Sequence, residues 1–380
     1  MSCVKLFFAG DFCCKPSTTK IAVSDELKNL IDSCDLKVVN FEVPLKPEAE
    51  LPPQSRERFF QNDDAPGFLR DLGFNLFSLA NNHAFDWGEE GFKKTRTVLD
   101  EASFGAGTYE EAYRVKTVEV RGVRFGFLGL SFAAYTGVFD DVTNHEGLGC
   151  AYINDLRVNH VIVEAKKKVD YLFILPHDGI EYIDVPLPET IARYRDFIDY
   201  GADGVIASHP HCPQGWEEYK GKPIFYSLGN FFFNSKETYD FRANKPHWYE
   251  GVCAVLTVEN GSIRWKEVNT RNVDNVGIEM DHGEDRDKHN EQICGYLSDK
   301  ELYGKYLKKV CLDLGTKELS IVDKTFRPQS LKERTKQLMK QWVAIIKGKK
   351  STNDYSIYRL LTHDARRNLL KWTIKNMGNF

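Results

Sequence analysis

The chain has 380 residues, of which 42% are hydrophobic, and a formal net charge of -4. This composition is sufficient for a sizeable packed core and excludes a globally disordered chain. The small net charge gives no reason to expect a nucleic-acid partner. The charge is nevertheless uneven, because residues 327–380 contain 13 Lys and Arg against 3 Asp and Glu. A basic tail therefore follows an acidic body.

Cysteine usage and hydropathy indicate a cytoplasmic protein. The nine cysteines are odd in number and include no C-x-x-C pair, which favours free thiols in a reducing compartment. No stretch approaches the roughly 20 apolar residues that a membrane-spanning helix needs. The apolar start, residues 1–10, runs directly into Asp11 and lacks the cleavage pattern of a signal peptide. We therefore expect a cytoplasmic chain without an integral membrane segment.

Short apolar runs alternate with helical patterns along most of the chain. The pattern predicts strands at residues 4–9, 36–41, 76–80, 171–175, 204–207, 224–227 and 252–259. It predicts helices at residues 24–33, 65–72, 90–102, 156–169 and 188–200. Residues 117–130 and 252–268 are each expected to contain a hairpin. Such alternation is typical of an α/β fold with a central sheet.

The pattern changes between residues 270 and 290. We expect a body domain at residues 1–270 and a charged linker with a basic helical extension at residues 271–380. Within the extension, the charge-rich stretch 280–290 is expected to be a loop, and amphipathic helices are predicted at residues 290–297, 331–346 and 355–376. The basic helices would dock on the acidic body or mediate homo-oligomerisation.

Polar residues follow five of the predicted strands at the point where each strand ends. These residues are Asp11, Glu42, Asn82 with His83, His177, and His209 with His211. In open α/β sheets, ligands bind beyond the carboxyl ends of the strands. Carboxylate, imidazole and carboxamide donors suit Mn, Fe, Zn or Mg. The set therefore predicts a metal site, with Glu42 as the candidate for a carboxylate that bridges two metals.

Each of these features also has a structural interpretation. An aspartate after a glycine at a strand end is common, His177 could be a satisfied core histidine, and Asp86 could cap the helix that follows it. Gly229 and Asn230 could form a tight turn, in which Asn230 presents its amide or backbone to the cleft. The repeated occurrence of polar residues at strand ends favours a functional site.

Taken in order, these residues resemble the capsule-synthesis CapA family, also described as poly-γ-glutamate capsule biosynthesis proteins. That family resembles a branch of the calcineurin-like metallophosphoesterases. The resemblance covers about residues 4–255 and leaves the C-terminal extension outside. The matching motifs are Gly10-Asp11, Asn40-Phe41-Glu42, Asn81-Asn82-His83 with Asp86 and Gly88, His177 with Gly179, Glu181 and Tyr182, Gly201-Ala202-Asp203, His209-Pro210-His211 with Gln214, and residues 226–231.

The resemblance implies a four-layer α/β/β/α sandwich with the site at one edge. It implies two divalent metals, of Mn, Fe or Zn type, and a metal-activated water as the attacking group. One metal would be held by Asp11, Glu42 and His211, and the second by Glu42, Asn82, His177 and His209. The implied catalytic residues are His83, which would protonate the leaving group, with Asp86 and Asn230. The implied substrate-binding residues are Asn81, Asp178, Glu181, Tyr182 and Gln214.

The sequence departs from the wider pattern at three positions. Cys13 stands where phosphoesterases usually carry a histidine, and it is either a thiolate ligand or a buried small residue. Glu42 replaces the usual bridging aspartate, so a weaker first site, or a different metal, would follow. Asp178 stands where the capsule family often has tryptophan, so substrate contacts are expected to differ.

The sequence thus favours a metal-dependent hydrolase of phosphoesterase type in capsule or other surface-polymer biosynthesis. Its substrate would be a small or polymeric anion related to poly-γ-glutamate or a polysaccharide. Two alternatives remain open. The chain could be a non-catalytic assembly factor, or it could be a metal-dependent γ-glutamyl amide hydrolase or transferase.

Overall fold

The computed structural model describes residues 3–15, 20–51, 58–133, 137–140, 145–234, 245, 247–316 and 363–377. The helix predicted at residues 331–346 and the first part of the one predicted at 355–376 lie outside these ranges. The last helix, α13 (Asp364–Met377), overlaps the second part of the range predicted at 355–376 and ends one residue beyond it.

The first sheet contains nine strands among the described residues, in the order β2-β17-β16-β15-β1-β3-β4-β5, with β14 also paired to β1. The strands β1, β3, β4, β5 and β14 run parallel, and β15 is antiparallel to β1. The bounds are β1 Val4–Cys13, β2 Ala22–Val23, β3 Leu36–Phe41, β4 Leu76–Ser78, β5 Ser103–Phe104, β14 Asn230–Phe233, β15 Glu250–Glu259, β16 Ser262–Val273 and β17 Gly277–Met280.

The second sheet contains six strands in the same described ranges, in the order β12-β13-β11-β10-β8-β7. Its strands β8, β10, β11 and β13 run parallel. The bounds are β7 Lys116–Val120, β8 Val123–Ser131, β10 Tyr171–His177, β11 Gly204–Ile206, β12 Trp216–Tyr219 and β13 Lys222–Phe225. Two further strands, β6 (Ala106–Gly107) and β9 (Gly149–Cys150), pair with each other.

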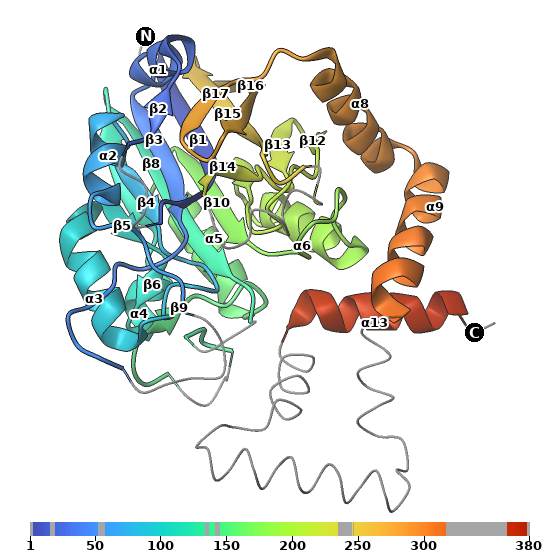
Figure 1. Ribbon diagram of the computed structural model, residues 1–380, viewed down its shortest axis with the longest axis horizontal. Helices are drawn as coiled ribbons and strands as arrows, with labels where there is room; N and C mark the ends of the chain where they lie inside the picture. The colour runs from blue at the N-terminus through green and yellow to red at the C-terminus, as the bar shows by residue number, and fades with distance from the viewer. Residues whose placement is uncertain are drawn as a thin grey trace, which may run out of the picture.

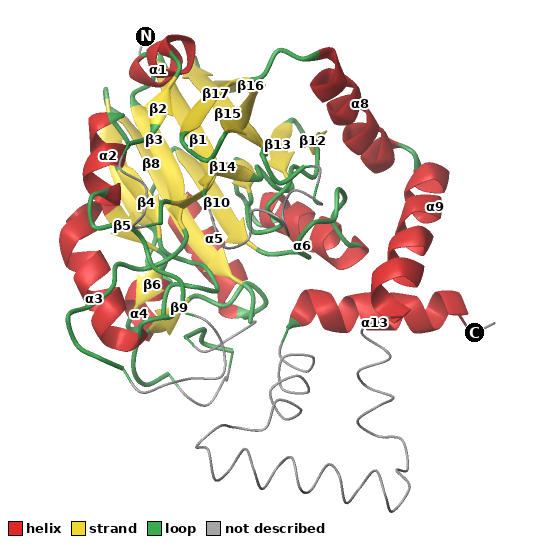
Figure 2. Ribbon diagram, in the orientation of Figure 1, coloured by secondary structure: helices red, strands yellow, loops and turns green. Residues whose placement is uncertain are grey.

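Helices cover the outer face of each sheet, so the layers are helix, sheet, sheet and helix (Figures 1 and 2). Apolar residues of α1, α2 and α3 share one core cluster with β1, β3 and β4, and those of α5 and α6 share another with β8, β10 and β11. The bounds of the body helices are α1 Asp25–Asp32, α2 Ala65–Asp71, α3 Gly88–Leu99, η1 Asp100–Ala102, α4 Tyr109–Ala112, α5 Arg157–Lys166 and α6 Pro188–Asp199. The four-layer α/β/β/α sandwich with a helical appendage is therefore confirmed.

A third core cluster joins the two sheets, and aromatic residues form its centre. Successive residues of a strand point to opposite faces, so Phe7 packs under the helices while Phe8 enters the space between the sheets. The Phe8 ring meets Phe173 edge-on at a centroid distance of 5.4 Å and lies 6.3 Å from Phe127. This layer fixes the two sheets against each other and thereby aligns their carboxyl ends.

The structure corrects two local predictions. The stretch 280–290 is not a loop, because α8 (Glu284–Ser298) begins within it. Its dense charge reflects an exposed helix start, where Glu284, Asp285 and Asp287 interact favourably with the helix dipole. The first strand was expected to end before Asp11, but β1 continues to Cys13 with a register shift at that aspartate.

The appendage lies beside the second sheet. After α8 come α9 (Lys300–Val310) and η3 (Cys311–Gly315), which reach α13 on the side of the molecule opposite α2 and α3 (Figure 1). Leu307, Val310 and Leu369 bury apolar surface against Ile180 and Ile183 of the body. The sheet continues to Met280, and the domain division predicted at residue 270 stays a prediction.

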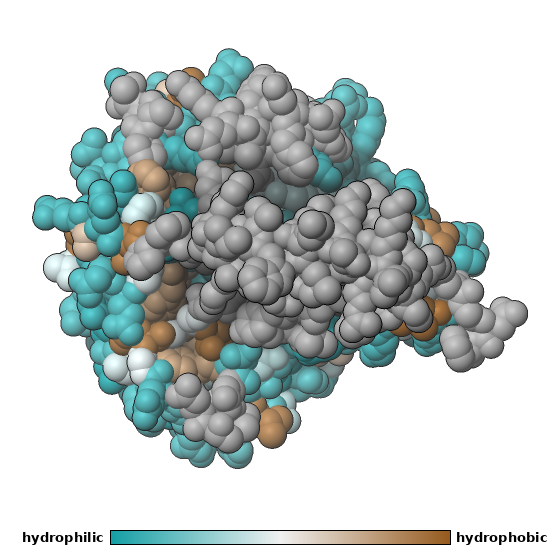
Figure 3. Space-filling view, turned by 60° about the horizontal axis from the view of Figure 1, so that its bottom comes forward, coloured by the Kyte–Doolittle hydropathy of each residue, from teal (hydrophilic) through white to brown (hydrophobic). Residues whose placement is uncertain are grey.

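On the face seen in Figure 3, the visible surface of the described residues is mostly hydrophilic, with small apolar patches in between. Among the helices of the described part of the chain, none combines the length and the apolar character that crossing a membrane requires. No disulfide joins any two of the nine cysteines, all of which lie in the described ranges.

Replacing Phe8 by alanine should remove the aromatic contact that joins the sheets. Because Phe8 is 1% exposed, we expect Phe8→Ala to lower the free energy of unfolding by about 3–5 kcal/mol. Urea denaturation measures this change. The matched control is Tyr200→Ala, at a ring that is 43% exposed, and it should shift stability by less than about 0.5 kcal/mol. Equal effects of the two substitutions would contradict the packing role of Phe8.

Candidate metal centre

The carboxyl ends of the parallel strands from both sheets meet at one end of the sandwich. Asp11 lies in β1, Glu42 follows β3, His83 follows β4, His177 ends β10, and His209 follows β11. Asn230, which opens β14, is the register partner of Asp11. The structure brings all of the predicted metal and catalytic residues together. They are connected through side-chain contacts of 4.0 Å or less.

Asp11, Glu42 and His211 form the most compact part of this cluster. Each offers one ligand atom, and these atoms lie within 4.8 Å of one another. His211 Nδ1 is 3.4 Å from Asp11 Oδ2, and its Nε2 is 3.5 Å from Glu42 Oε1. Both carboxylates are fully buried. Two carboxylates and an imidazole are a donor set that fits a divalent cation.

His177, His209 and Asn82 lie next to this group. His177 Nε2 is 2.8 Å from Asn82 Oδ1 and 3.2 Å from His209 Nδ1. His177 Nδ1 is 3.3 Å from Ser208 Oγ, and its distance to Asp11 Oδ1 is 3.7 Å. The Asn40 amide nitrogen lies 3.1 Å from the same Nδ1, so Asn40 and Ser208 hold the ring on one edge while Nε2 faces Asn82 and His209.

Burial shifts the protonation of the cluster. Desolvation raises the pKa of Asp11 to about 6, although Asn40 and the backbone N–H of His209 donate hydrogen bonds to it at 2.7 and 3.1 Å. Burial also lowers the pKa of His177 well below its usual value, and the neighbouring histidines act in the same direction. The imidazole is therefore held neutral, which is the form that coordinates a metal.

The backbone is strained where it carries the histidines. His209 has φ 106° and His211 has φ 57°, and positive φ costs a non-glycine residue on the order of 1–3 kcal/mol. This conformation turns the two imidazoles into the cluster from either side of Pro210. Strain of this kind concentrates at functional sites.

His83 lies at the outer edge of the cluster. Its Nδ1 is 2.9 Å from Asp86 Oδ2, and its Nε2 is 4.0 Å from Glu42 Oε1. The His83 side chain is 12% exposed, whereas that of His211 is 5% exposed. Asp86 therefore fixes the ring so that Nε2 faces both the cluster and the solvent side.

A close approach of two glycines positions Asp11. The Asp11 N–H donates a hydrogen bond to the Gly229 carbonyl at 2.9 Å. A Cβ on Gly10 would lie 2.0 Å from the same carbonyl oxygen, so a side chain there cannot fit. Gly229 itself has φ 66°, in agreement with the tight turn expected before Asn230.

The predicted substrate-binding residues occupy two levels. Glu181 and Tyr182 are half-buried at the rim, and the Tyr182 ring lies 6.3 Å from that of His211. Beneath them, Gln214 is 1% exposed and donates to the carbonyl of Ile183 at 2.8 Å. Asn81 is likewise buried and donates to the Phe41 carbonyl at 3.0 Å. Gln214 and Asn81 therefore support the site from below.

Asp178 is buried behind His177. Its carboxylate accepts a hydrogen bond from Thr190 at 3.4 Å. Burial, together with the nearby charge of Asp364, raises its pKa to about 7.

Sequence reasoning missed several residues of the site. Asn40 donates a hydrogen bond to Asp11, and Ser208 lies within hydrogen-bond distance of His177. Asn40 is part of the Asn40-Phe41-Glu42 motif and Ser208 directly precedes His209, but neither was predicted to support the site. Trp248 packs 4.9 Å from the His211 ring, and its carbonyl accepts from Asn230 at 2.9 Å. The ring of His363, directly before α13, is tilted against that of Phe132 at a centroid distance of 4.5 Å and lies 6.5 Å from that of His209. No local pattern indicated that the C-terminal segment reaches the site.

Cys13 lies in an apolar cluster with Val43, Phe233 and Trp248, and it is completely buried. This packing agrees with its interpretation as a buried small residue.

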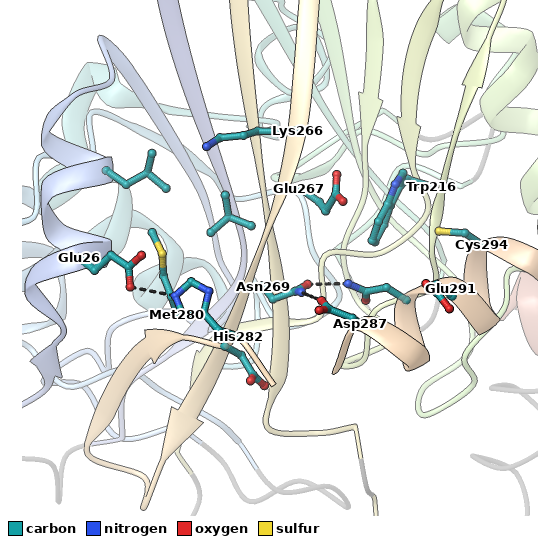
Figure 4. A pocket seen from close by; sticks show the side chains of 14 residues that line it. Glu26, Trp216, Lys266, Glu267, Asn269, Met280, His282, Asp287, Glu291 and Cys294 are labelled. Carbon is teal, nitrogen blue, oxygen red and sulfur yellow. Dashed lines mark hydrogen bonds and ion pairs between the residues drawn. The ribbon is translucent and has the colours of Figure 1, made fainter. Parts of the chain in front are cut away.

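A broad hollow of about 980 Å³ lies elsewhere on the molecule, between α1, β16, β17 and α8 (Figure 4). Glu26 pairs with His282 on one side of it, and Asn269 contacts Asp287 and Asn290 on the other. None of the residues that line it belongs to the metal cluster. Cavity size therefore does not locate the site in this fold.

A family model described as bacterial capsule synthesis protein PGA_cap matches residues 5–235, which is more than half of the chain. The chain belongs to the bacterial capsule synthesis protein family. The CapA resemblance inferred from the motifs is thereby confirmed. The matched segment contains all of the predicted metal ligands, whereas Trp248 and His363 lie beyond it.

Curated relatives share part of the chain. It is 31% identical over 249 residues to the capsule biosynthesis protein CapA of Bacillus anthracis, covering 62% of this chain and 59% of that protein. It is 32% identical over 202 residues to the PGA biosynthesis protein CapA of Bacillus subtilis, covering 51% and 52% respectively. The chain thus spans between half and three fifths of these relatives.

Solved structures give a more distant comparison. A crystal structure of a novel phosphatase from Mycoplasma pneumoniae covers 71% of this chain and 94% of that one, at 13% identity and a TM-score of 0.40. Similarity at this level does not bear on activity.

Gly10→Ala should displace Asp11 from the cluster because its Cβ would collide with the backbone of Gly229. We expect a loss of about 1–3 kcal/mol in unfolding free energy from overpacking, together with weaker divalent-metal binding measured by calorimetry. The control is Gly67→Ala in α2, where a Cβ meets nothing within 4 Å. That variant should be neutral or more stable by up to about 1 kcal/mol. If the two variants bind metal equally well, the glycine contact does not position the site.

Proposed function

We propose that this capsule-synthesis family member is a metal-dependent hydrolase of phosphoesterase type. The observation that carries the proposal is the buried group of Asp11, Glu42 and His211, whose ligand atoms lie within 4.8 Å of one another. His177, His209 and Asn82 extend this group on one side. Buried charges are paired or coordinate metals, and two buried carboxylates that share one imidazole fit metal coordination.

The ligands divide into two sets that share Glu42. Asp11, Glu42 and His211 would hold one divalent cation, and Glu42, Asn82, His177 and His209 would hold a second. Nitrogen and oxygen donors of this kind suit Mn, Fe or Zn. Bound cations would supply positive charge that lowers the pKa of water and stabilises charge developing on a phosphoryl group.

His83 is placed to hold a proton at Nε2. Asp86 contacts Nδ1 at 2.9 Å, which orients the ring and leaves Nε2 as the nitrogen that faces the site. Because His83 is the most exposed histidine of the cluster, its Nε2 can meet the leaving group of a substrate that enters from solvent. Protonation by a positioned histidine is typically worth about 10²–10⁴-fold in rate.

The substrate class is proposed from the relatives. These are named for capsule and PGA biosynthesis, and a further one, 27% identical over 208 residues, is a probable polyglutamine synthesis accessory protein of Mycobacterium tuberculosis. We assign the activity to an anionic precursor or polymer of the cell surface. A γ-glutamyl amide as the bond that is cleaved, or a purely scaffolding role, would appear as distinct outcomes of the tests below.

His209→Ala should remove metal and activity together. Purified wild-type protein is expected to retain divalent metal, measured by plasma mass spectrometry, and to hydrolyse bis(p-nitrophenyl) phosphate when supplied with Mn²⁺. The variant should bind less metal and lose hydrolysis. The control is His160→Ala, because His160 is exposed on α5, and it should keep both properties. A wild-type protein that neither binds Mn, Fe or Zn nor cleaves the ester would contradict the proposal.

His83→Ala should separate catalysis from metal binding. We expect metal content to stay at the wild-type level while turnover of an alkyl phosphodiester falls by about 10²–10⁴-fold. The loss should be much smaller for p-nitrophenyl esters, whose leaving group needs no proton. Capsule formation in cells that carry the variant provides a second measurement. Full complementation by His83→Ala would indicate an assembly role instead of catalysis.

A further inference from the structure

A second group of metal-ligating side chains lies outside the cluster described above. It comprises Asp184, His247 and His289, whose ligand atoms also lie within 4.8 Å of one another. Asp184 lies in the loop between β10 and α6, His247 precedes β15, and His289 is part of α8. Three segments that are distant in the sequence therefore bring their donors to one point.

The two imidazoles are arranged in parallel. Their ring centroids are 3.6 Å apart, and the ring planes differ by 14°. Glu250 Oε2 lies 2.8 Å from His289 Nδ1 and 3.0 Å from His247 Nδ1. One carboxylate oxygen thus faces the Nδ1 edge of both rings.

Glu250 Oε2 and Arg286 Nη1 occupy the Nδ1 edge of His289, at 2.8 and 3.1 Å. Arg286 Nη1 is also 2.6 Å from the same carboxylate oxygen. The nitrogen of His289 that these two side chains leave available is therefore Nε2.

His289 Nε2 has no hydrogen-bond partner among the described residues. The residue is only 8% exposed, so solvent water has little access to Nε2 as a hydrogen-bond partner. A buried polar atom left without a partner costs about 1–3 kcal/mol. A cation bound at this nitrogen would remove that cost, and Asp184 offers the carboxylate that would complete the site.

We propose that Asp184, His247 and His289 form a second metal site, selective for a borderline divalent cation such as Zn²⁺. Imidazole nitrogens with one carboxylate oxygen are a common ligand set for Zn²⁺. A carboxylate behind the ligating imidazole, in the position of Glu250, typically orients the ring and raises its basicity. Arg286 balances the charge of Glu250.

The site would attach the appendage to the body. His289 belongs to α8, and Asp184 also accepts a hydrogen bond from the Tyr306 hydroxyl of α9 at 3.3 Å. The residue after His247 is Trp248, which packs on His211 of the candidate metal centre. A cation held here would therefore order both the docked helices and one wall of the metal centre.

Zinc binding by the full-length chain tests the proposal. The protein is stripped with a chelator, titrated with ZnCl₂ alone and desalted, and bound zinc is counted by plasma mass spectrometry. Asp184→Asn and His247→Ala should each bind one equivalent less than wild type and lose part of the zinc-dependent rise in Tm. The control is His282→Ala, an exposed histidine that lies 2.9 Å from the single carboxylate of Glu26. It should match wild type.

The readout is a difference between variants, so it does not depend on whether the candidate metal centre is loaded. Combining Asp184→Asn with His209→Ala should lower zinc content further than either change alone. Asp184 is half-buried in a loop, so its isosteric replacement is expected to fold, and circular dichroism checks this. Wild-type zinc stoichiometry in a folded Asp184→Asn chain would overturn the site. An equal loss in His282→Ala would overturn it as well.

Discussion

Two carboxylates, Asp11 and Glu42, are removed from water at the point where the two sheets end, and much of the surrounding structure serves to make this possible. A buried carboxylate is costly unless charges or hydrogen bonds compensate it. Here the compensation is brought by distant segments: Asn40 and His209 N–H reach Asp11, while His211 contacts both carboxylates. The register shift in β1 and the positive φ of the two histidines are local costs of that arrangement.

The fold was largely predictable because its signals are local. The parallel strands are short apolar runs, and buried strands of this kind are readable without knowledge of their neighbours. The predicted range 36–41 coincides with β3. The errors arose where packing overrides local pattern. The strand β14 forms because Asn230 and the phenylalanines after it pair with the end of β1. The sequence of the start of α8 is so highly charged that it is typical of a loop, although it folds as a helix.

The candidate site was predictable to the same extent. Residues at strand ends lie near one another by topology, so Asp11, Glu42 and the histidines could be grouped from the sequence. Residues that reach the site from far along the chain could not. Trp248 and His363 have no periodic or motif signal. Trp248 packs in a cluster with Cys13, Val43 and Phe233, and His363 lies beside Phe132 at the start of the last helix of the appendage. The sequence also did not show that Gln214 supports the site from below, because a motif does not reveal whether a residue is buried.

The position of β15 has a consequence for how this family is divided into units. The family match ends at residue 235, whereas β15 lies beside β1 near the middle of the first sheet. A fragment cut at the end of the match would leave the backbone of β1 uncovered along Val4–Phe8, the residues that pair with β15. Exposed apolar edges of this kind recruit strands from other molecules. The segment that sequence comparison recognises is therefore shorter than the segment that completes the sheet beside β1, and expression of this fold in pieces should include the longer one.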